Sequence, residues 1–404
     1  MRADGRVFFL DITRLVARAG SAPLTGIDRV ERAYLRKMAR FGDRSYILTR
    51  TALGWLALHG RHGEQILAWI DGAEPLRPAP LWARLLAGSR RTPALESALR
   101  DIAVARMWPY GLGRWIRQVA PTDAVWLSVG HVNLDEATLG QVRIDGGATV
   151  VVMIHDTIPL DHPEWSGKGA PSRFAAALDA CIQFSDLILC PSTFAADSVR
   201  RHRPARQPIL VAPLGITLAT ADNSLLPPGL NLTHPYFVAL GTIEPRKNID
   251  LLLRVWAELG ANGTEGPCPH LHLIGQRGWN STALFRTLNS APFMGKTVFE
   301  HGALPDAAVM ALLQGARGFL APSRAEGFGI PVVEAACLGL PVLATDLAVT
   351  REILGDYPTY LPPDDIAAWL SAIRTFPHHR SLTPLNPARF DWTAHFNLVF
   401  SKIT

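Results

Sequence analysis

The sequence predicts an α/β protein made of two parallel-sheet domains that face a cleft. Short apolar runs rich in Val, Ile, Leu and Phe alternate with amphipathic segments along the whole chain, which is the pattern of parallel strands covered by helices on both faces. The chain has 404 residues, too many for one ordinary core and suitable for two domains of roughly 150 to 200 residues each. Ligands bind preferentially in the clefts between such domains.

The expected strands form two sets, and each set predicts a Rossmann-like, doubly wound sheet. Residues 215–234 lie between the sets, lack periodicity and carry turn residues, so we interpret them as a linker. The domains are then residues 1–214 and 235–387, and the aromatic tail at 388–404 is expected to form a helix that crosses back to the first domain. The expected strands cover residues 7–12, 46–49, 125–129, 149–155, 187–190 and 209–212, followed by 236–241, 271–275, 297–301, 318–321 and 341–345.

Composition and charge exclude several classes of protein. With 48% hydrophobic and 19% charged residues, the chain is expected to fold throughout. The four cysteines show no CxxC pair and no His partner at zinc-ligand spacing, so we interpret them as reduced core residues of a cytoplasmic protein. The N-terminal apolar run predicts neither a signal peptide nor a membrane span. A net charge of +5 permits anionic partners, and we expect no nucleic acid among them.

Residues 77–117 combine tryptophan and arginine with almost no acidic residues. This mixture suits the interface of an anionic membrane, where indole rings are buried and guanidinium groups stay wet. Solvated helices that cover the first domain are an equally open interpretation. The basic and aromatic residues of this segment include Trp82, Arg84, Arg90, Arg91, Arg100, Arg106, Trp108, Arg114 and Trp115.

The most specific stretch is FLAPSRAEGFGIPVVEAACLGLPVLATD at residues 319–346, which predicts a strand, a loop, a helix, a turn and a second strand. Pro331 fits the first turn of the helix, where its missing N–H costs nothing. Gly327 and Gly329 let loop amides approach a ligand closely. Because a helix N-terminus attracts anions, we expect this loop to bind a diphosphate.

Two glutamates accompany this helix start. Glu326 lies in the loop and Glu334 lies about one turn into the helix, so both can face the same cleft. A carboxylate accepts two hydrogen bonds from a vicinal diol. We therefore assign Glu334 to a ribose and Glu326 to the hydroxyls of a donor sugar; the alternative is a pair of surface glutamates beside a tight turn.

A second motif, ALGTIEPRKNIDLLLRVWAEL, predicts a strand that ends at Gly241 and a helix that begins near Asn248. Arg246 and Lys247 then project from the loop at the carboxyl edge of the sheet, which is the usual ligand side. Adjacent cations there can neutralise the charge that grows on a departing nucleoside diphosphate. An exposed basic turn is the alternative interpretation.

In the first half, the strand-like run VVMIHDTIP ends in His155 and Asp156. Their position at a strand end suits contact with the transferred sugar or the acceptor. His131 and Asn133 follow the preceding strand and are further candidates for acceptor contact. Structural roles stay open, because a lone His at a strand end is commonly a hydrogen-bond partner and a plain turn explains His131 and Asn133. The His-Asp pair has no partners at metal-ligand spacing.

The two C-terminal motifs resemble the large retaining glycosyltransferase family numbered four. Its members carry a loop of the E-P-R-K-N type and then the signature E-G-F-G-x-P-x-x-E-A, which is present here at residues 326–335 without a gap. The resemblance is strong over residues 236–355 and weaker before them. It implies the GT-B fold, an N-terminal acceptor domain, a C-terminal nucleotide-sugar domain, and a reaction that needs no metal or other cofactor.

The resemblance also implies a role for each matching residue. The catalytic set would be His155, Glu326 and Lys247, and Glu334 would bind the ribose. Some members carry an Arg directly after the strand's Gly, where this chain has Thr242, so that phosphate contact is either absent or supplied by Arg246. The remaining donor contacts would come from Gly26, Gly241, Thr242, Arg246, Lys247, Gly327, Phe328 and Gly329.

The implied function is transfer of a sugar, with retention, from a nucleoside-diphosphate sugar to a glycan or lipid-linked acceptor. The setting suggested by the family is assembly of surface polysaccharide or lipopolysaccharide at the inner face of a bacterial membrane. A nucleotide-sugar epimerase or phosphorylase, and a non-catalytic nucleotide-sugar-binding protein, stay open as alternatives. A GxGxxG run is absent after the first strand, which disfavours a dehydrogenase.

Overall fold

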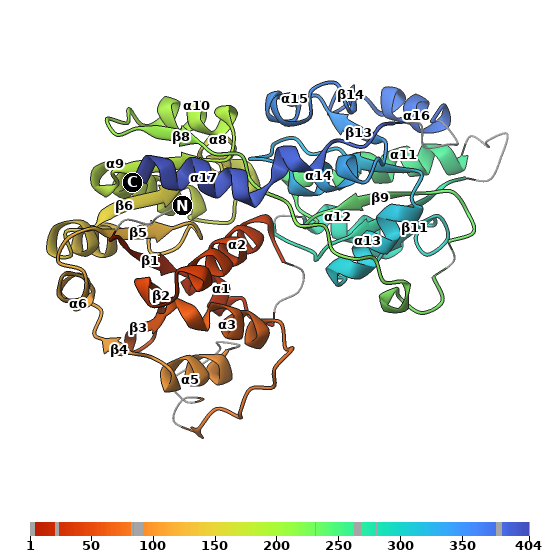
Figure 1. Cartoon of the computed structure of the whole chain (residues 1–404). Helices are drawn as coiled ribbons and strands as arrows, with labels where there is room; N and C mark the ends of the chain where they lie inside the picture. The colour runs from red at the N-terminus through yellow and green to blue at the C-terminus, as the bar shows by residue number, and fades with distance from the viewer. Residues whose placement is uncertain are drawn as a thin grey trace.

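The computed structural model describes residues 5–20, 24–81, 84, 92–230, 232–261, 268–279, 281–376 and 382–403. Strands β1 to β8 form one sheet and β9 to β14 form a second, and each sheet lies in its own half of the molecule (Figure 1). The strand orders are β4-β3-β2-β1-β5-β6-β7-β8 and β11-β10-β9-β12-β13-β14. The two parallel-sheet domains that the sequence predicts are therefore confirmed.

The first sheet is parallel except at one edge. Its parallel strands are β1 (Val7–Asp11), β2 (Ser45–Thr51), β5 (Ala124–Ser128), β6 (Thr149–Met153), β7 (Leu187–Cys190) and β8 (Ile209–Val211). Strands β3 (Gly54–His59) and β4 (Ala105–Met107) pair antiparallel beyond β2, which corrects the expectation of a wholly parallel sheet. Gly54 makes the tight β2–β3 turn possible, because its φ is +107° and a Cβ there would meet the Met107 carbonyl oxygen at 2.1 Å.

The second sheet is parallel throughout. Its strands are β9 (Tyr236–Leu240), β10 (His270–Ile274), β11 (Val298–Glu300), β12 (Gly318–Ala321), β13 (Val342–Thr345) and β14 (Thr359–Leu361). The edge strand β14 has three residues and was not expected from the sequence. The other strands lie within one or two residues of the predicted ranges, since each is an apolar run with a Gly, Pro or polar boundary.

Helices cover both faces of each sheet, as a doubly wound fold requires. In the first domain they are α1 (Thr13–Ala17), α2 (Gly26–Phe41), α3 (Gly63–Ile70), α5 (Pro93–Asp101), α6 (Leu112–Val119), α7 (Glu136–Gly140), α8 (Ile158–Asp161), α9 (Ala170–Phe184) and α10 (Thr193–His202). In the second they are α11 (Ile249–Ala261), α12 (Thr282–Ser290), α13 (Asp306–Gly315), α14 (Ile330–Cys337), α15 (Ala348–Leu354) and α16 (Ile366–Arg374). One buried apolar cluster runs through both domains, and each domain has a further cluster of its own on the opposite sheet face.

The last helix, α17 (Trp392–Ile403), crosses back to the first domain, as predicted (Figure 1). Its His395 bonds the Tyr34 hydroxyl through Nε2 and the Pro213 carbonyl through Nδ1, each at 2.9 Å. The linker and the tail also touch directly, because the Ile216 N–H donates to the Phe390 carbonyl at 2.9 Å. The linker and the C-terminal tail therefore connect the two domains side by side.

The segment at 77–117 contributes α5, β4 and α6 to the outer edge of the first domain. Trp108 and Tyr110 are 78% and 84% exposed, whereas Trp115 packs edge-on against Phe9 and Tyr46 and does not belong to an exposed aromatic surface. Trp82, Arg90 and Arg91 lie outside the described residues. No helix in the described part of the chain is long and apolar enough to cross a membrane.

Candidate functional site

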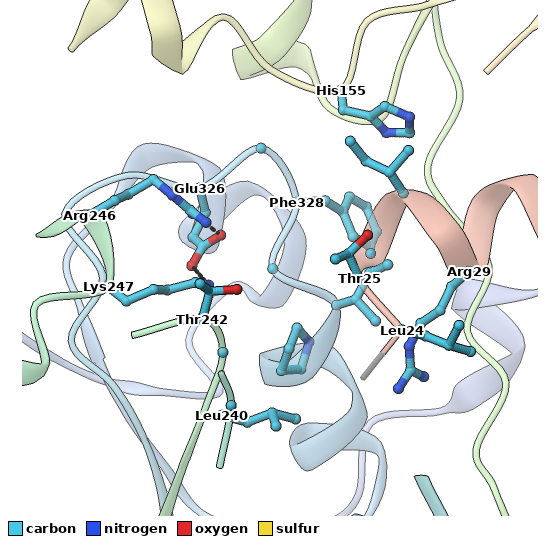
Figure 2. Close-up of a pocket in the computed structure, with 18 of the residues that line it drawn as sticks. Leu24, Thr25, Arg29, His155, Leu240, Thr242, Arg246, Lys247, Glu326 and Phe328 are labelled. Carbon is cyan, nitrogen blue, oxygen red and sulfur yellow. Dashed lines mark hydrogen bonds and ion pairs between the residues drawn. The ribbon is translucent and has the colours of Figure 1, made fainter. Parts of the chain in front are cut away.

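A cavity of about 370 Å³ lies between the two domains, at the edge where the parallel strands end. Its lining includes residues that follow β1, β6, β9, β10, β11 and β12, and Figure 2 shows residues that follow β1, β6, β9 and β12. Ligands in open α/β folds bind at this edge. The predicted site residues that line the cavity are Gly26, His155, Asp156, Gly241, Thr242, Arg246, Lys247, Glu326, Gly327, Phe328 and Gly329.

Arg246 and Lys247 hold Glu326 between them. Lys247 Nζ lies 2.5 Å from Glu326 Oε1, and Arg246 Nη1 lies 2.9 Å from Oε2; Figure 2 marks both contacts with dashed lines. Arg246 also pairs with Glu244 at 2.8 Å. All of these residues belong to the second domain, so the cluster forms without help from the first.

Charge pairing decides the ionisation of this cluster. Burial alone would raise the pKa of Glu326, but Lys247 and Arg246 outweigh it and lower that pKa to about 2. Burial lowers the pKa of Lys247, and Glu326 partly offsets this. Burial also opposes the charge of Arg246, yet Glu326 and Glu244 together raise its pKa. At neutral pH Arg246 and Lys247 are therefore held as cations by their carboxylate partners Glu326 and Glu244, and a bound anion would share these cations with the two carboxylates.

The glycine loop starts helix α14 beside this cluster. Gly329 is the residue before the helix and has φ +86°, a left-handed conformation that favours glycine, and no side chain caps the helix. Gly329, Ile330 and Pro331 all line the cavity. A helix N-terminus without a capping side chain provides N–H groups and positive potential to an anion.

Gly327 has a role beyond the one predicted for it. A Cβ at Gly327 would lie 2.5 Å from the His155 carbonyl oxygen, so this glycine lets the loop of the second domain approach the first. Ser192 Oγ, from the first domain, donates to the Gly327 carbonyl at 3.1 Å. The absence of a side chain therefore serves contact between domains, in addition to any approach of a ligand.

A second cross-domain contact lies next to that one. Glu352 of α15 accepts hydrogen bonds from the backbone N–H groups of Thr193 and Phe194, at 2.6 and 2.9 Å. Those groups begin helix α10 of the first domain. A carboxylate of one domain thus stabilises a helix N-terminus of the other.

His155 lines the cavity two residues beyond β6. Its Nε2 lies 2.8 Å from the Val129 carbonyl, and because a carbonyl can only accept, Nε2 carries the proton and Nδ1 is left as an acceptor. Burial lowers the pKa of His155 to about 4, despite the opposing effect of the Val129 hydrogen bond. The ring is therefore neutral at pH 7 and suited to accept a hydrogen bond from a hydroxyl.

The three residues predicted to contact the acceptor lie in different surroundings. Asp156 lines the cavity, and burial raises its pKa. His131 is not a lining residue; its Nε2 accepts the His155 backbone N–H at 3.0 Å, so it supports His155 from behind. Asn133 donates to Asp11 at 2.8 Å and takes part in the packing of the first domain.

Glu334 is buried, with an exposed fraction of 1%, and does not line the cavity. Its Oε1 accepts from Arg29 Nη1 at 2.6 Å, and Arg29 Nη2 also bonds Asp306 at 2.9 Å. Arg29 belongs to α2 of the first domain, so this contact spans the cleft. Burial raises the pKa of Glu334 to about 7, although Arg29 acts to lower it. Its Oε2 has no hydrogen-bond partner within the described residues.

Several residues that line the cavity were not predicted from the sequence. Arg29, Asp306 and Trp279 line the cavity but belong to no motif. Thr25 also lines it and forms a capping box with Asp28 at the start of α2, a pattern that the T-x-x-D spacing could have revealed. Gly275 could not be replaced, since a Cβ there would meet the Gly241 carbonyl oxygen at 2.0 Å.

Within the residues that the structure describes, no group of three or more His, Cys, Asp and Glu side chains is arranged to hold a metal ion. Metal independence stays a prediction of the sequence analysis.

Residues 226–383 match the model of the protein family described as "Glycosyl transferases group 1". The chain carries a glycosyl transferases group 1 domain. This domain contains β9 to β14 and both motifs identified in the sequence. The predicted relationship to bacterial polysaccharide-type glycosyltransferases is confirmed, whereas the family number and retention stay predictions.

Sequence relatives of the chain include two proteins of Escherichia coli. Serotype-specific mannosyltransferase WbdA is 30% identical over 258 residues, which cover 58% of this chain and 31% of WbdA. O-antigen chain mannosyltransferase B is 35% identical over 226 residues, which cover 54% of this chain and 58% of that protein. The chain thus spans about a third of WbdA and less than two thirds of either relative.

Solved structures match the fold over nearly its whole length. HepE of Anabaena, in complex with UDP and glucose, has a TM-score of 0.63 at 15% identity and covers 98% of this chain and 99% of its own. The lipopolysaccharide outer core galactosyltransferase WaaB has a TM-score of 0.57 at 16% identity, with the same coverage. At such identities the likeness concerns the fold alone, and it confirms the predicted GT-B architecture.

Proposed function

We propose that the chain is a glycosyltransferase that moves a sugar from a nucleoside-diphosphate sugar to a glycan or lipid-linked acceptor. The observation that carries the proposal is the pairing of Arg246 and Lys247 with Glu326 beside the uncapped start of α14, inside a cavity between two domains. Two cations and a helix N-terminus can stabilise a departing diphosphate, while the carboxylate can hold sugar hydroxyls.

The cavity lining combines charged and apolar side chains, which supports a nucleotide as ligand. Arg246, Lys247 and Glu326 are among its charged residues, whereas Leu240, Ile274, Leu304 and Val309 are among its apolar residues. A base is flat and weakly polar on its faces and suits the apolar residues, and a diphosphate suits the cations. Glu334, currently bonded by Arg29, is the carboxylate that we assign to the ribose.

The proposed reaction proceeds with retention and without a metal ion. The acceptor hydroxyl attacks the anomeric carbon on the face that the diphosphate leaves, the C–O bond to the diphosphate breaks, and the departing phosphate oxygen takes the acceptor proton. Lys247 and Arg246 stabilise the negative charge that develops. Neutral His155 accepts a hydrogen bond from the donor sugar or the acceptor, and Asp156 orients the acceptor.

The proposed setting is assembly of surface polysaccharide or lipopolysaccharide at the cytoplasmic face of a bacterial membrane. Relatives named as O-antigen and serotype-specific mannosyltransferases support it. Exposed Trp108 and Tyr110 in the basic segment at 77–117 support contact with an anionic membrane there. Vesicle co-sedimentation tests that contact: binding should require anionic lipid and fall when both aromatic side chains are replaced by Ala.

The decisive experiment for the proposed function has two stages. A thermal-shift screen with UDP-, GDP- and dTDP-sugars identifies the donor, because a ligand well above its Kd adds a few kcal/mol, about 2.7 at a hundredfold excess. Proton NMR of the product then gives the configuration of the new linkage; an inverted anomeric centre contradicts retention. Full activity in EDTA is expected, and its loss contradicts metal independence.

The same assay separates the alternatives. Donor turnover without an acceptor indicates an epimerase, and a requirement for free phosphate indicates a phosphorylase. Nucleotide affinity without transfer to any acceptor indicates a binding protein.

A further inference from the structure

Trp279 occupies an unusual place at the mouth of the cavity. It is half exposed, with an exposed fraction of 50%, and among the described residues it is the one strongly exposed large apolar side chain that also lines the cavity. A large, half-exposed aromatic ring that lines a cavity offers a rigid apolar face on which a ligand can pack.

The ring is held in place from the opposite domain. The Trp279 indole N–H donates to the carbonyl of Trp165 at 2.8 Å. Trp165 belongs to a short turn after α8, and its own ring stacks on His162 with the ring centres 4.0 Å apart. One edge of the Trp279 indole is therefore fixed, while much of the ring stays open to solvent.

We propose that Trp279, supported by Trp165 and His162, is a stacking subsite for a sugar of the acceptor, completed only when the two domains close. The apolar C–H face of a pyranose ring packs on an indole face, and the rigid ring costs little entropy on binding. Partly exposed His162 and Glu164 lie at the same turn and can meet the hydroxyls at the sugar's rim. The inference rests on the proposed function, because it names the acceptor as a glycan.

The position favours the acceptor over the donor base. Leu240, Ile274, Leu304 and Val309 are apolar residues that line the cavity, and all four are less exposed than Trp279. The Trp165 carbonyl comes from the first domain, from the same segment as Asp156, which the proposed function assigns to the acceptor. A subsite built from both domains would bind the acceptor better once the donor has favoured closure.

Saturation-transfer difference NMR with a mannotriose tests the subsite without requiring turnover. The full chain is saturated with the nucleoside diphosphate found in the thermal-shift screen, and four proteins are compared: wild type, Trp279→Ala, Trp279→Phe and the control Ile144→Ala, which removes an exposed side chain outside the cavity. We expect ring-proton signals from the sugar with wild type and the control, a loss of at least about fivefold in Trp279→Ala, and partial retention in Trp279→Phe.

Nucleotide affinity and sugar transfer are measured on the same proteins. Calorimetry should show that Trp279→Ala binds the nucleoside diphosphate with a Kd within about twofold of wild type, a difference of about 0.4 kcal/mol. A loss of nucleotide affinity as large as the loss of sugar signals would make Trp279 a donor contact and overturn the proposal. Unchanged sugar signals in Trp279→Ala, or none with wild type, would also overturn it. Sugar binding that depends on Trp279, without transfer from any donor, would instead contradict the proposed function and leave the subsite intact.

Discussion

Glu326 and Glu334 belong to one short motif, yet the two carboxylates have opposite environments. Glu326 lies between two cations of its own domain, and their charges lower its pKa to about 2. Glu334 is buried beside a single arginine of the other domain, and burial raises its pKa to about 7. One acid is charged and fixed before the domains meet, while the other depends on the domains being closed.

The cleft contains two kinds of contact, one within the second domain and one between the domains. The cluster of Arg246, Lys247 and Glu326 is preorganised, which is what stabilisation of a transition state requires. The contacts of Arg29 with Glu334, of Glu352 with α10, and of Ser192 with Gly327 span the cleft and can respond to a ligand. A donor ribose could bond Glu334 through Oε2, beside the Oε1 that Arg29 holds, so binding and domain position are coupled.

The largest effect is expected from breaking the preorganised cluster. Lys247→Met removes a cation that is 13% exposed and contacts Glu326, and we expect kcat to fall about 10² to 10³-fold, the usual cost of removing one transition-state stabiliser. The affinity for the nucleoside diphosphate should fall much less. Single-turnover rates and calorimetric Kd values measure the two quantities separately.

The matched control for that variant is Lys296→Met, which removes an exposed lysine of the same domain outside the cavity. Its rate should equal that of the wild type. Equal losses of rate and affinity in Lys247→Met would contradict a role on the leaving group.

A smaller effect is expected from holding the domains apart. A Cβ in Gly327→Ala would lie 2.5 Å from the His155 carbonyl oxygen, so closure must become incomplete, and displacement of a site by about 1 Å can cost on the order of 10²-fold in rate. We expect a loss of about 30-fold, within that bound. Nucleotide binding, which the second domain provides in our proposal, should persist.

Gly260→Ala is the control, because a Cβ there meets nothing within 4 Å. Small-angle scattering should show a larger radius of gyration for Gly327→Ala than for the control. A Gly327→Ala enzyme with full activity would show that this approach of the domains is not needed.

The sequence predicts the cluster around Glu326 but not the contact between Arg29 and Glu334. Arg246, Lys247 and Glu326 follow strands whose apolar runs are easily recognised, and the strand ends of a parallel sheet meet at one edge. Arg29 and Glu334 are 305 residues apart, and no periodicity links them. Their contact comes from the relative placement of two domains, which local patterns do not encode.

The fold shows the same contrast. The predicted strands at 187–190 and 318–321 coincide with β7 and β12, because buried parallel strands read as continuous apolar runs. Strands β4 and β14 have three residues each, with the sequences ARM and TYL, so neither forms an apolar run as the equally short β8 does with ILV. They are strands because a neighbouring strand leaves an edge to be paired.

Glu334 and Glu326 should make the stability of the folded chain depend on pH in opposite directions. The folded-state pKa of Glu334, about 7, lies above its ordinary value of 4.5, so the folded state binds more protons in that window and the glutamate's contribution to stability falls as pH rises from 4.5 to 7. The slope cannot exceed about 1.4 kcal/mol per pH unit. Glu326, with a pKa of about 2, contributes stability above pH 4.5 that is lost as pH falls towards 2.

Calorimetric Tm values between pH 5 and pH 8 measure this contrast in Glu334→Gln and Glu326→Gln. The difference in Tm between wild type and Glu334→Gln should change with pH below about 7, by about 2 to 4 °C per kcal/mol for a domain of this size. The difference for Glu326→Gln should stay constant over the same range. Parallel curves for the two variants would contradict the assigned environments.

The smallest effect is expected at the cross-domain helix cap. Glu352→Ala removes both acceptors from the backbone N–H groups of Thr193 and Phe194, and loss of a cap costs about 1 kcal/mol. If that energy favours the closed state, the donor KM should rise about fivefold with kcat little changed, since 1.4 kcal/mol is tenfold. Glu352→Gln keeps one acceptor oxygen without the charge and should lose about half as much energy. A drop in Tm without any change in donor KM would mean that Glu352 only stabilises α10 and has no part in closing the cleft.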